Sequence, residues 1–280
     1  AVYVAPDAPE ALNLLNQNNI ACFRTPESCA ESVKTFLNTK NPVKPKILKN
    51  NLSDISKKLK KNIFKNLSEE EALEIFRDIG IKIVDYKVTI NIKQAIEYSS
   101  QIGFPVAMKV LSSQILHKTE TGGIELNIKN IKELKISFQK LSDVFKRLKI
   151  NAEEKKFLIQ KMEKGISEII LGYRVDELVG PIVVIGSGGI LSEIYNDKSI
   201  RMAPVDIREA KKMIKEVKSL VTLNGYRGLP KADINIIATA IVNMSKLALI
   251  REIKEAEINP VIVKKENEGI VAVDGLITAN

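Results

Sequence analysis

The sequence predicts an α+β protein in which helices and antiparallel strands follow one another in mixed order. Short runs rich in Val and Ile alternate with segments of helical periodicity over most of the chain. Several consecutive strands are separated by turns alone, so the strict strand–helix–strand repetition of a doubly wound parallel sheet does not occur. The 280 residues, of which 45% are hydrophobic, are enough to bury a sizeable core.

The composition indicates a globular protein without membrane association. No apolar run approaches the roughly 18 residues that a bilayer-spanning helix needs. The first residues show no secretory leader, and the lack of an initial methionine is consistent with a trimmed piece of a longer polypeptide. Cys22 and Cys29 have no second Cys or His pair to complete a zinc site. We therefore expect both thiols to be reduced and structural, which favours the cytoplasm.

The formal net charge of +9 raises the question of a nucleic-acid partner, because clustered Lys and Arg neutralise phosphates. Basic residues concentrate in 44–66 and 129–156. Aromatic residues make up only 5% of the chain, and no stacking pattern interleaves the lysines. We interpret these segments as a solvated linker and solvated helix faces, and we expect no nucleic-acid partner.

The elements at the N-terminus are typical of the end of a parallel α/β unit. Residues 1–40 contain an expected strand at 1–4, a helix at 9–18 and a short apolar segment at 20–23. A second helix begins at Thr25-Pro26-Glu27, where Thr can cap the helix and Pro suits its first turn. This part is too short to fold alone. Residues 41–66, rich in Pro, Lys and Asn, are predicted to be an exposed linker.

A second domain is predicted over 67–280. Ser68 and Glu71 form a capping box, which starts a helix that Gly80 closes. The later elements alternate between the two periodicities. Strands are expected at 81–88, 105–110, 124–128, 157–162, 167–175, 180–189, 257–263 and 269–275, and helices at 91–101, 130–148, 207–219 and 231–249.

Phosphate chemistry is indicated by the segment that contains Lys109 and His117, the only histidine of the chain. A buried strand seldom carries a lysine, and the loop glycines Gly122 and Gly123 leave backbone amides able to face an anion. His117 is then a candidate phosphoryl acceptor, the alternative being a loop histidine with no chemical task. The glycine-rich turns at 122–123 and 186–189 do not match a Walker sequence.

Eight motifs in order carry a specific resemblance. They read PVAMKV, ILHKTETGG, FLIQKM, GPIVVIGSGGILSEIYND, IRMAPVD, GYRGLP, EINPVIV and VAVDG. Over about 68–280 the chain resembles the ATP-grasp region of ADP-forming acyl-CoA synthetases, relatives of the nucleotide-binding subunit of succinyl-CoA synthetase. The resemblance implies an ATP-grasp fold, with two α+β subdomains and a nucleotide cleft between them. Residues 1–40 resemble, less specifically, the end of the CoA-ligase domain that precedes it in fused members.

The resemblance also implies roles for residues of the nucleotide site. Lys109 would place its ammonium against phosphates, unless it simply extends from a strand edge into solvent. Arg201 would approach phosphate, with a surface salt bridge as an equal alternative. The glycines of the turn at 186–189 would offer backbone amides to the nucleotide, or would only permit a tight turn. The remaining implied contacts are adenine at Gln160 and Met162, ribose at Glu168, and the loop groups Gly186, Gly188, Gly189 and Glu193.

A metal constellation is predicted near the C-terminus. Alternation on a strand puts Glu257 and Asn259 on the same side, and Asp274 of the neighbouring strand can meet them. Such oxygen ligands suit Mg²⁺ that also touches substrate phosphates. By resemblance, Asn259 and Asp274 are the direct ligands and Glu257 is a supporting carboxylate.

The resemblance implies the reaction acyl-CoA + ADP + phosphate ⇌ carboxylic acid + CoA + ATP. A primary phosphohistidine would lie in a CoA-binding domain or alpha subunit, which also binds most of the coenzyme A, and His117 would relay its phosphate to ADP. We therefore expect a hetero- or homo-oligomer that uses ATP or ADP and Mg²⁺. Two alternatives stay open: another ATP-grasp carboxylate ligase, and a nucleotide-sensing module of a fused acetyltransferase.

Overall fold

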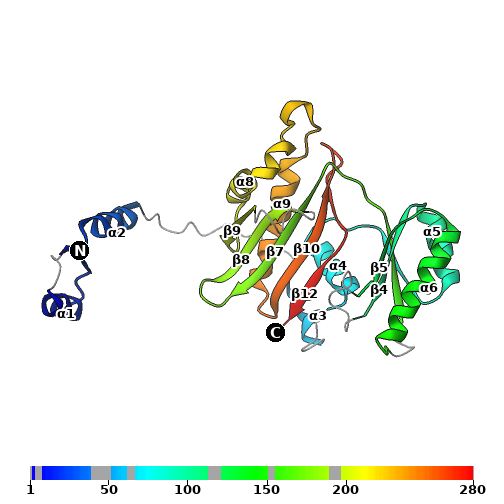
Figure 1. Ribbon diagram of the computed structural model, residues 1–280, viewed down its shortest axis with the longest axis horizontal. Helices are drawn as coiled ribbons and strands as arrows, with labels where there is room; N and C mark the ends of the chain where they lie inside the picture. Colours follow the sequence, from blue (N-terminus) through cyan, green and yellow to red (C-terminus); the bar gives the residue numbers. More distant parts are fainter. Residues whose placement is uncertain are drawn as a thin grey trace. The chain divides into compact units, whose positions relative to one another are not determined.

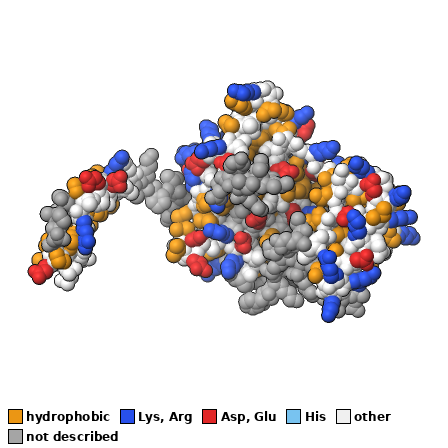
Figure 2. Space-filling view, viewed as in Figure 1, with side chains coloured by type: hydrophobic (Ala, Val, Ile, Leu, Met, Phe, Trp, Pro, Cys, Tyr) orange, Lys and Arg blue, Asp and Glu red, His pale blue; other side chains and the backbone are white. Residues whose placement is uncertain are grey.

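A computed structural model describes residues 2–3, 8–38, 52–61, 67–112, 121–150, 155–188 and 197–279 (Figure 1). The chain divides into two compact units, Ala1–Lys44 and Pro45–Asn280. Among the described helices, none combines the length and the apolar composition that crossing a bilayer requires. On the face seen in Figure 2, Lys and Arg side chains are dispersed among acidic and apolar ones, consistent with solvated basic surfaces.

The first unit has the strand–helix alternation that the sequence predicts. Strand β1 (Val2–Tyr3) pairs in parallel with β2 (Cys22–Phe23), and the helices are α1 (Pro9–Gln17) and α2 (Pro26–Asn38). None of the side chains described in this unit is buried. Helix α2 exposes Phe36 and Leu37 at 79% and 75%. The described part of the unit therefore lacks a core of its own.

The predicted exposed linker is wrong for residues 52–61. This segment forms helix α3 (Leu52–Lys61), and its Ile55 and Leu59 are only 2% and 4% exposed within the core of the second unit. The two apolar residues lie four apart and therefore on one helical face. The segment is otherwise rich in lysine, which favoured the prediction of a solvated linker.

The smaller sheet of the second unit has four antiparallel strands in the order β3-β6-β4-β5. They are β3 (Tyr86–Thr89), β4 (Val106–Leu111), β5 (Ile124–Ile128) and β6 (Lys156–Lys161). Helices α5 (Ile92–Ile102) and α6 (Ile131–Arg147) flank this sheet, each capped by an asparagine side chain (Figure 1). All six residues of β4 are buried, which makes its lysine the exception that the sequence indicated.

In the larger sheet, β10 (Ile253–Val263) pairs with β7 on one side and with β11 and β12 on the other. Its other strands are β7 (Ser167–Asp176), β8 (Gly180–Ser187), β9 (Lys198–Met202), β11 (Ile270–Ala272) and β12 (Leu276–Ala279), all antiparallel to their neighbours. Helices α8 (Ile207–Glu216) and α9 (Ile234–Ser245) cover one face (Figure 1). The short helices η2 (Lys218–Leu223), η3 (Tyr226–Gly228) and η4 (Lys246–Leu249) complete this part.

Helix α4 (Glu69–Asp78) connects the two sheets. Its N-terminus has the predicted capping box, in which the Ser68 hydroxyl accepts from the Glu71 amide and the Glu71 carboxylate accepts from the Ser68 amide. Phe76 is fully buried and packs so closely on the β11–β12 connection that a side chain at Gly275 would collide with its ring. The larger sheet therefore fixes the position of the helix.

We predict that Gly275→Ala destabilises the protein by about 1–3 kcal/mol, because the new Cβ would lie 2.6 Å from Cε2 of the buried Phe76 ring. Urea unfolding followed by circular dichroism measures the loss. The matched control is Gly172→Ala, whose Cβ would lie 3.7 Å from Val184 in ordinary contact. Equal stability of the two variants would contradict the close approach of α4.

Candidate functional site

The candidate site is built around the buried ammonium of Lys109. Its Nζ lies 2.7 Å from Glu69 Oε1, 3.0 Å from the Val273 carbonyl oxygen and 3.1 Å from Asp274 Oδ2. The Lys109 side chain is 5% exposed, that of Glu69 is fully buried, and that of Asp274 is 31% exposed. Lys109 comes from the smaller sheet, Glu69 from α4, and the other two from the β11–β12 connection, so the ammonium joins the two sheets.

Two opposing effects act on the pKa of Lys109. Burial lowers it, since a charged amine loses its hydration. The carboxylates of Glu69 and Asp274 outweigh this effect by attraction and hydrogen bonding, and the pKa lies above its ordinary value. Lys109 is therefore a fixed cation at neutral pH, not a proton donor or acceptor.

The predicted metal residues lie on β10 and on the β11–β12 segment, which runs antiparallel to it. Val261 pairs with Ala272, and the Val273 amide donates to the Pro260 carbonyl at 3.3 Å. Further along, Glu257 pairs with Leu276 in the same register. Asn259 and Asp274 are therefore opposite one another, between these two pairs.

A bulge in β10 allows this polar site to share a strand with the core. The pairing with β7 shifts by one residue between Ile258 and Val261. The side chains of Ala256 and Ile258 before the bulge, and of Val261 and Val263 after it, all face the helix-covered core. Without the extra residue, strand alternation would turn the side chains on one side of the bulge to the opposite face of the sheet. Glu257, which alternates with Ala256 and Ile258, lies on the face away from the helices.

The donors at this position fit a hard divalent cation. Glu257 and Asp274 offer carboxylate oxygens, and Asn259 offers its amide oxygen, since its Nδ2 donates to Glu257 Oε1 at 3.2 Å. The backbone amide of Gly275 donates to Asp274 Oδ1 at 2.8 Å, which orients the carboxylate. Within the described residues no cluster of three or more His, Cys, Asp or Glu forms a rival metal site.

Gln160 lies beside the buried Lys109–Glu69 pair. It is 2% exposed on β6, and its Nε2 lies 3.4 Å from Glu69 Oε1. Met162 follows β6, where its backbone amide donates to the Pro105 carbonyl at 3.2 Å and its side chain is half-buried. The adenine contact implied for these residues stays a prediction.

Gly188 has a structural reason to be glycine. Its amide donates to the Glu168 carbonyl at 2.8 Å, and a Cβ would lie 2.8 Å from the Glu168 carbonyl carbon. Gly186 is buried in β8, and the exposed Glu168 lies across from Ile262. Within the described residues, no hydrogen bond or ion pair connects Gly186 or Glu168 with Lys109.

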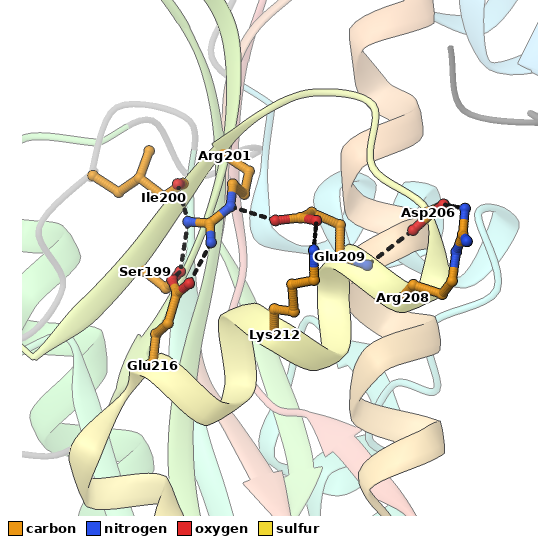
Figure 3. A network of polar contacts seen from close by, with 8 residues as sticks. All are labelled: Ser199, Ile200, Arg201, Asp206, Arg208, Glu209, Lys212 and Glu216. Carbon is orange, nitrogen blue, oxygen red and sulfur yellow. Dashed lines mark hydrogen bonds and ion pairs between the residues drawn. The ribbon is translucent and has the colours of Figure 1, made fainter. Parts of the chain in front are cut away.

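Arg201 lies on the helix-covered side of the larger sheet. Cross-strand pairing puts it in one row with Val183, Tyr173 and Ala256, whose side chains face the helices. There it donates to Glu209 at 2.8 Å and also to Glu216, both on α8 (Figure 3). Hydrogen bonds from Arg201 hold the pKa of each carboxyl below its ordinary value. The salt bridges match the alternative stated for Arg201, and its approach to phosphate stays a prediction.

Three predicted residues, His117, Gly189 and Glu193, lie outside the described residues. The structure adds Glu69, which no pattern in the sequence singled out. Three consecutive glutamates begin α4, although the capping box needs only Glu71. An acidic residue three positions before Ala72, the first buried apolar residue of the helix, was the available signal.

Comparison with known families decides the classification. Residues 57–279, most of the chain, match the family described as ATP-grasp domain. The chain belongs to the ATP-grasp family. Among its relatives, the ADP-forming acetate–CoA ligase I subunit beta of Pyrococcus furiosus is 38% identical over 207 residues, which cover 74% of this chain and 88% of the relative. The chain is thus an ATP-grasp member of the ADP-forming acetate–CoA ligase beta-subunit family, a family of acid–thiol ligases.

Two further relatives extend this ATP-grasp assignment. The ADP-forming acetate–CoA ligase of Methanocaldococcus jannaschii is 32% identical over 278 residues, covering 92% of this chain and 39% of the relative. A solved chain of the dinucleotide-forming acetyl-coenzyme A synthetase 1 of Ca. Korarchaeum cryptofilum is 34% identical, with a TM-score of 0.73. The match covers 81% of this chain and 99% of that chain. The predicted α+β ATP-grasp fold is confirmed.

We predict unequal losses of stability for the two partners of the Lys109–Asp274 pair. Lys109→Met leaves the Glu69 carboxylate buried without its cation, which costs about 3–5 kcal/mol. Asp274→Ala leaves the ammonium paired with Glu69 and costs about 1 kcal/mol or less, as for other partly exposed side chains. Urea unfolding compares the two variants.

The double variant Lys109→Met/Glu69→Gln is the control, because it removes both buried charges. We expect it to recover part of the stability lost in Lys109→Met. If the double variant loses as much stability as the single variants Lys109→Met and Glu69→Gln lose when added together, charge pairing is not what holds this cluster.

Proposed function

We propose that this chain is the nucleotide-binding part of an ADP-forming acyl-CoA synthetase, which catalyses acyl-CoA + ADP + phosphate ⇌ carboxylic acid + CoA + ATP. The observation that carries the proposal is the meeting of Lys109 and Asp274 from separate sheets, 3.1 Å apart, beside the oxygen donors of β10. A fixed cation next to such donors suits a magnesium-bound polyphosphate.

The charged and polar side chains of the chain would have separate roles in binding the magnesium–nucleotide complex. Lys109 would bind phosphate oxygens as a point charge. Asp274 and Asn259 would hold Mg²⁺, supported by Glu257, and Mg²⁺ would neutralise charge on the transferred phosphoryl group. The related Korarchaeum synthetase was solved with coenzyme A and Mg-AMPPCP, which supports the choice of ligands. Gln160, Met162, Glu168 and the loop residues 186–193 are proposed to bind the rest of the nucleotide.

We further propose a phosphohistidine relay through His117. An acyl phosphate would pass its phosphoryl group to a primary histidine of the partner, which releases the carboxylate. His117 would accept the group as a new N–P bond forms and the first N–P bond breaks, and ADP would then take it to give ATP. The Korarchaeum synthetase, whose phosphohistidine segment points toward the nucleotide-binding site in one structure, supports a mobile histidine carrier in the family.

The relay requires a CoA-binding domain or alpha subunit, so we propose a hetero- or homo-oligomeric enzyme. Two observations support this: the first unit has apolar side chains without a core, and the Methanocaldococcus relative is much longer than this chain. We assign 1–40 to the end of a CoA-ligase-like domain and the second unit, with α3 in its core, to the ATP-grasp domain. The free thiols of Cys22 and Cys29 support a cytoplasmic location.

The other candidate functions have weaker support. A carboxylate–amine ligase of the ATP-grasp type would use Lys109, Asn259 and Asp274 but has no need of His117. A nucleotide-sensing module would not need a complete set of metal donors. The family match to acid–thiol ligases favours the synthetase.

The first test is calorimetric titration of the full chain with ADP, with and without magnesium. We expect magnesium-dependent binding, which Asp274→Ala abolishes while circular dichroism stays unchanged. Magnesium-independent binding, or none, would remove the proposed metal site.

The second test is His117→Ala in the enzyme reconstituted with its CoA-binding partner. We expect loss of ATP formation from acyl-CoA, while phosphate still accumulates on the primary histidine. Acid-labile label from radioactive ATP should reach His117 in the wild type and not in the variant. Normal ATP synthesis by the variant would eliminate the relay.

A further inference from the structure

Glu69 is a buried acid that capping of its own helix does not require. The capping box of α4 is complete with Ser68 and Glu71, and Glu70 lies at a half-buried position. The Glu69 carboxylate instead meets Lys109 of β4 at 2.7 Å and Gln160 of β6 at 3.4 Å. Burying a carboxylate is costly, so its pairing with Lys109 calls for a physical reason.

The reason lies in the number of donors on Lys109. An ammonium has three N–H groups, and three oxygens surround it at 2.7–3.1 Å. Two of these acceptors, Glu69 and the Val273 carbonyl, are supplied by fixed parts of the fold. The third, Asp274, is 31% exposed and is also a proposed ligand of the cation.

We propose that Glu69 is a positioning residue that holds Lys109 while the third N–H of its ammonium turns from Asp274 to a nucleotide phosphate. The inference rests on the proposed function, because it assumes that Asp274 takes up a divalent cation. With Glu69 in place, Asp274 can leave the ammonium without creating an unpaired buried charge. Without Glu69, Lys109 would depend on Asp274 and would compete with the cation for it.

The test is titration of the full chain carrying Glu69→Gln, which keeps the size of the side chain and removes its charge. We expect ADP affinity at saturating magnesium to fall about tenfold, the scale of one hydrogen bond to a charged group. The magnesium concentration for half-maximal ADP binding should rise, because Lys109 now retains Asp274. Affinity for adenosine, which has no phosphate, should stay within about twofold.

The matched control is Glu70→Gln, which removes one charge from the same helical turn without touching Lys109. We expect it to bind ADP, adenosine and magnesium as the wild type does. Should Glu69→Gln fail to fold, Glu69→Asp replaces it, because it keeps the charge and withdraws it by one methylene group. The same selective loss of ADP binding is expected there.

The outcomes separate this inference from the proposed function. Wild-type protein that binds no ADP with magnesium would overturn both. Wild-type binding combined with unchanged ADP affinity in the Glu69 variant would overturn the positioning role alone. Equal weakening of adenosine and ADP would also overturn it, because that pattern indicates a general disturbance of the fold.

Discussion

The structure depends on the neutralisation of one buried ammonium. Lys109 lies on a strand whose six residues are all buried, so its charge must be matched by acids from other elements. Glu69 can reach it only if the first turn of α4 lies against β4, and Asp274 only if the β11–β12 connection does. Gly275 then has to pass Phe76 without a side chain. One electrostatic requirement thus sets the relative placement of two sheets and a helix.

The two faces of the larger sheet differ: one packs against the helices of the core, and the other carries Glu257, a proposed ligand group. Arg201 and the carboxylates of α8 tie β9 to the helices on one face (Figure 3), where the core lies. Glu257 lies on the other face, and the bulge in β10 lets the strand continue into the core beyond it. Substitutions on the helix face are therefore expected to act through packing, and those on the opposite face through ligand binding.

Local signals in the sequence predicted most of the elements, and long-range pairing explains the failures. The capping box at Ser68 and the lysine in β4 were predictable because each has a short-range pattern, and the opposition of Asn259 and Asp274 because their strands are neighbours in the sequence and pair. The face of Arg201 depends on the register of four strands, and the burial of Ile55 depends on α3 meeting a distant core. The importance of Glu69 follows from a contact 40 residues away in sequence, which its own helix does not indicate.

The charges at the junction of the sheets bear on the proposed cation site. Glu69, Asp274 and Glu257 contribute three negative charges, and Lys109 is the cation that ties the first two together. The two charges left over equal those of one divalent ion. Carboxylates that lack counter-charge repel one another, and a divalent cation bound beside them would offset that repulsion. The proposed metal ion would therefore offset the two unmatched negative charges, which leaves the Lys109 ammonium to face the negative charge of the nucleotide phosphates.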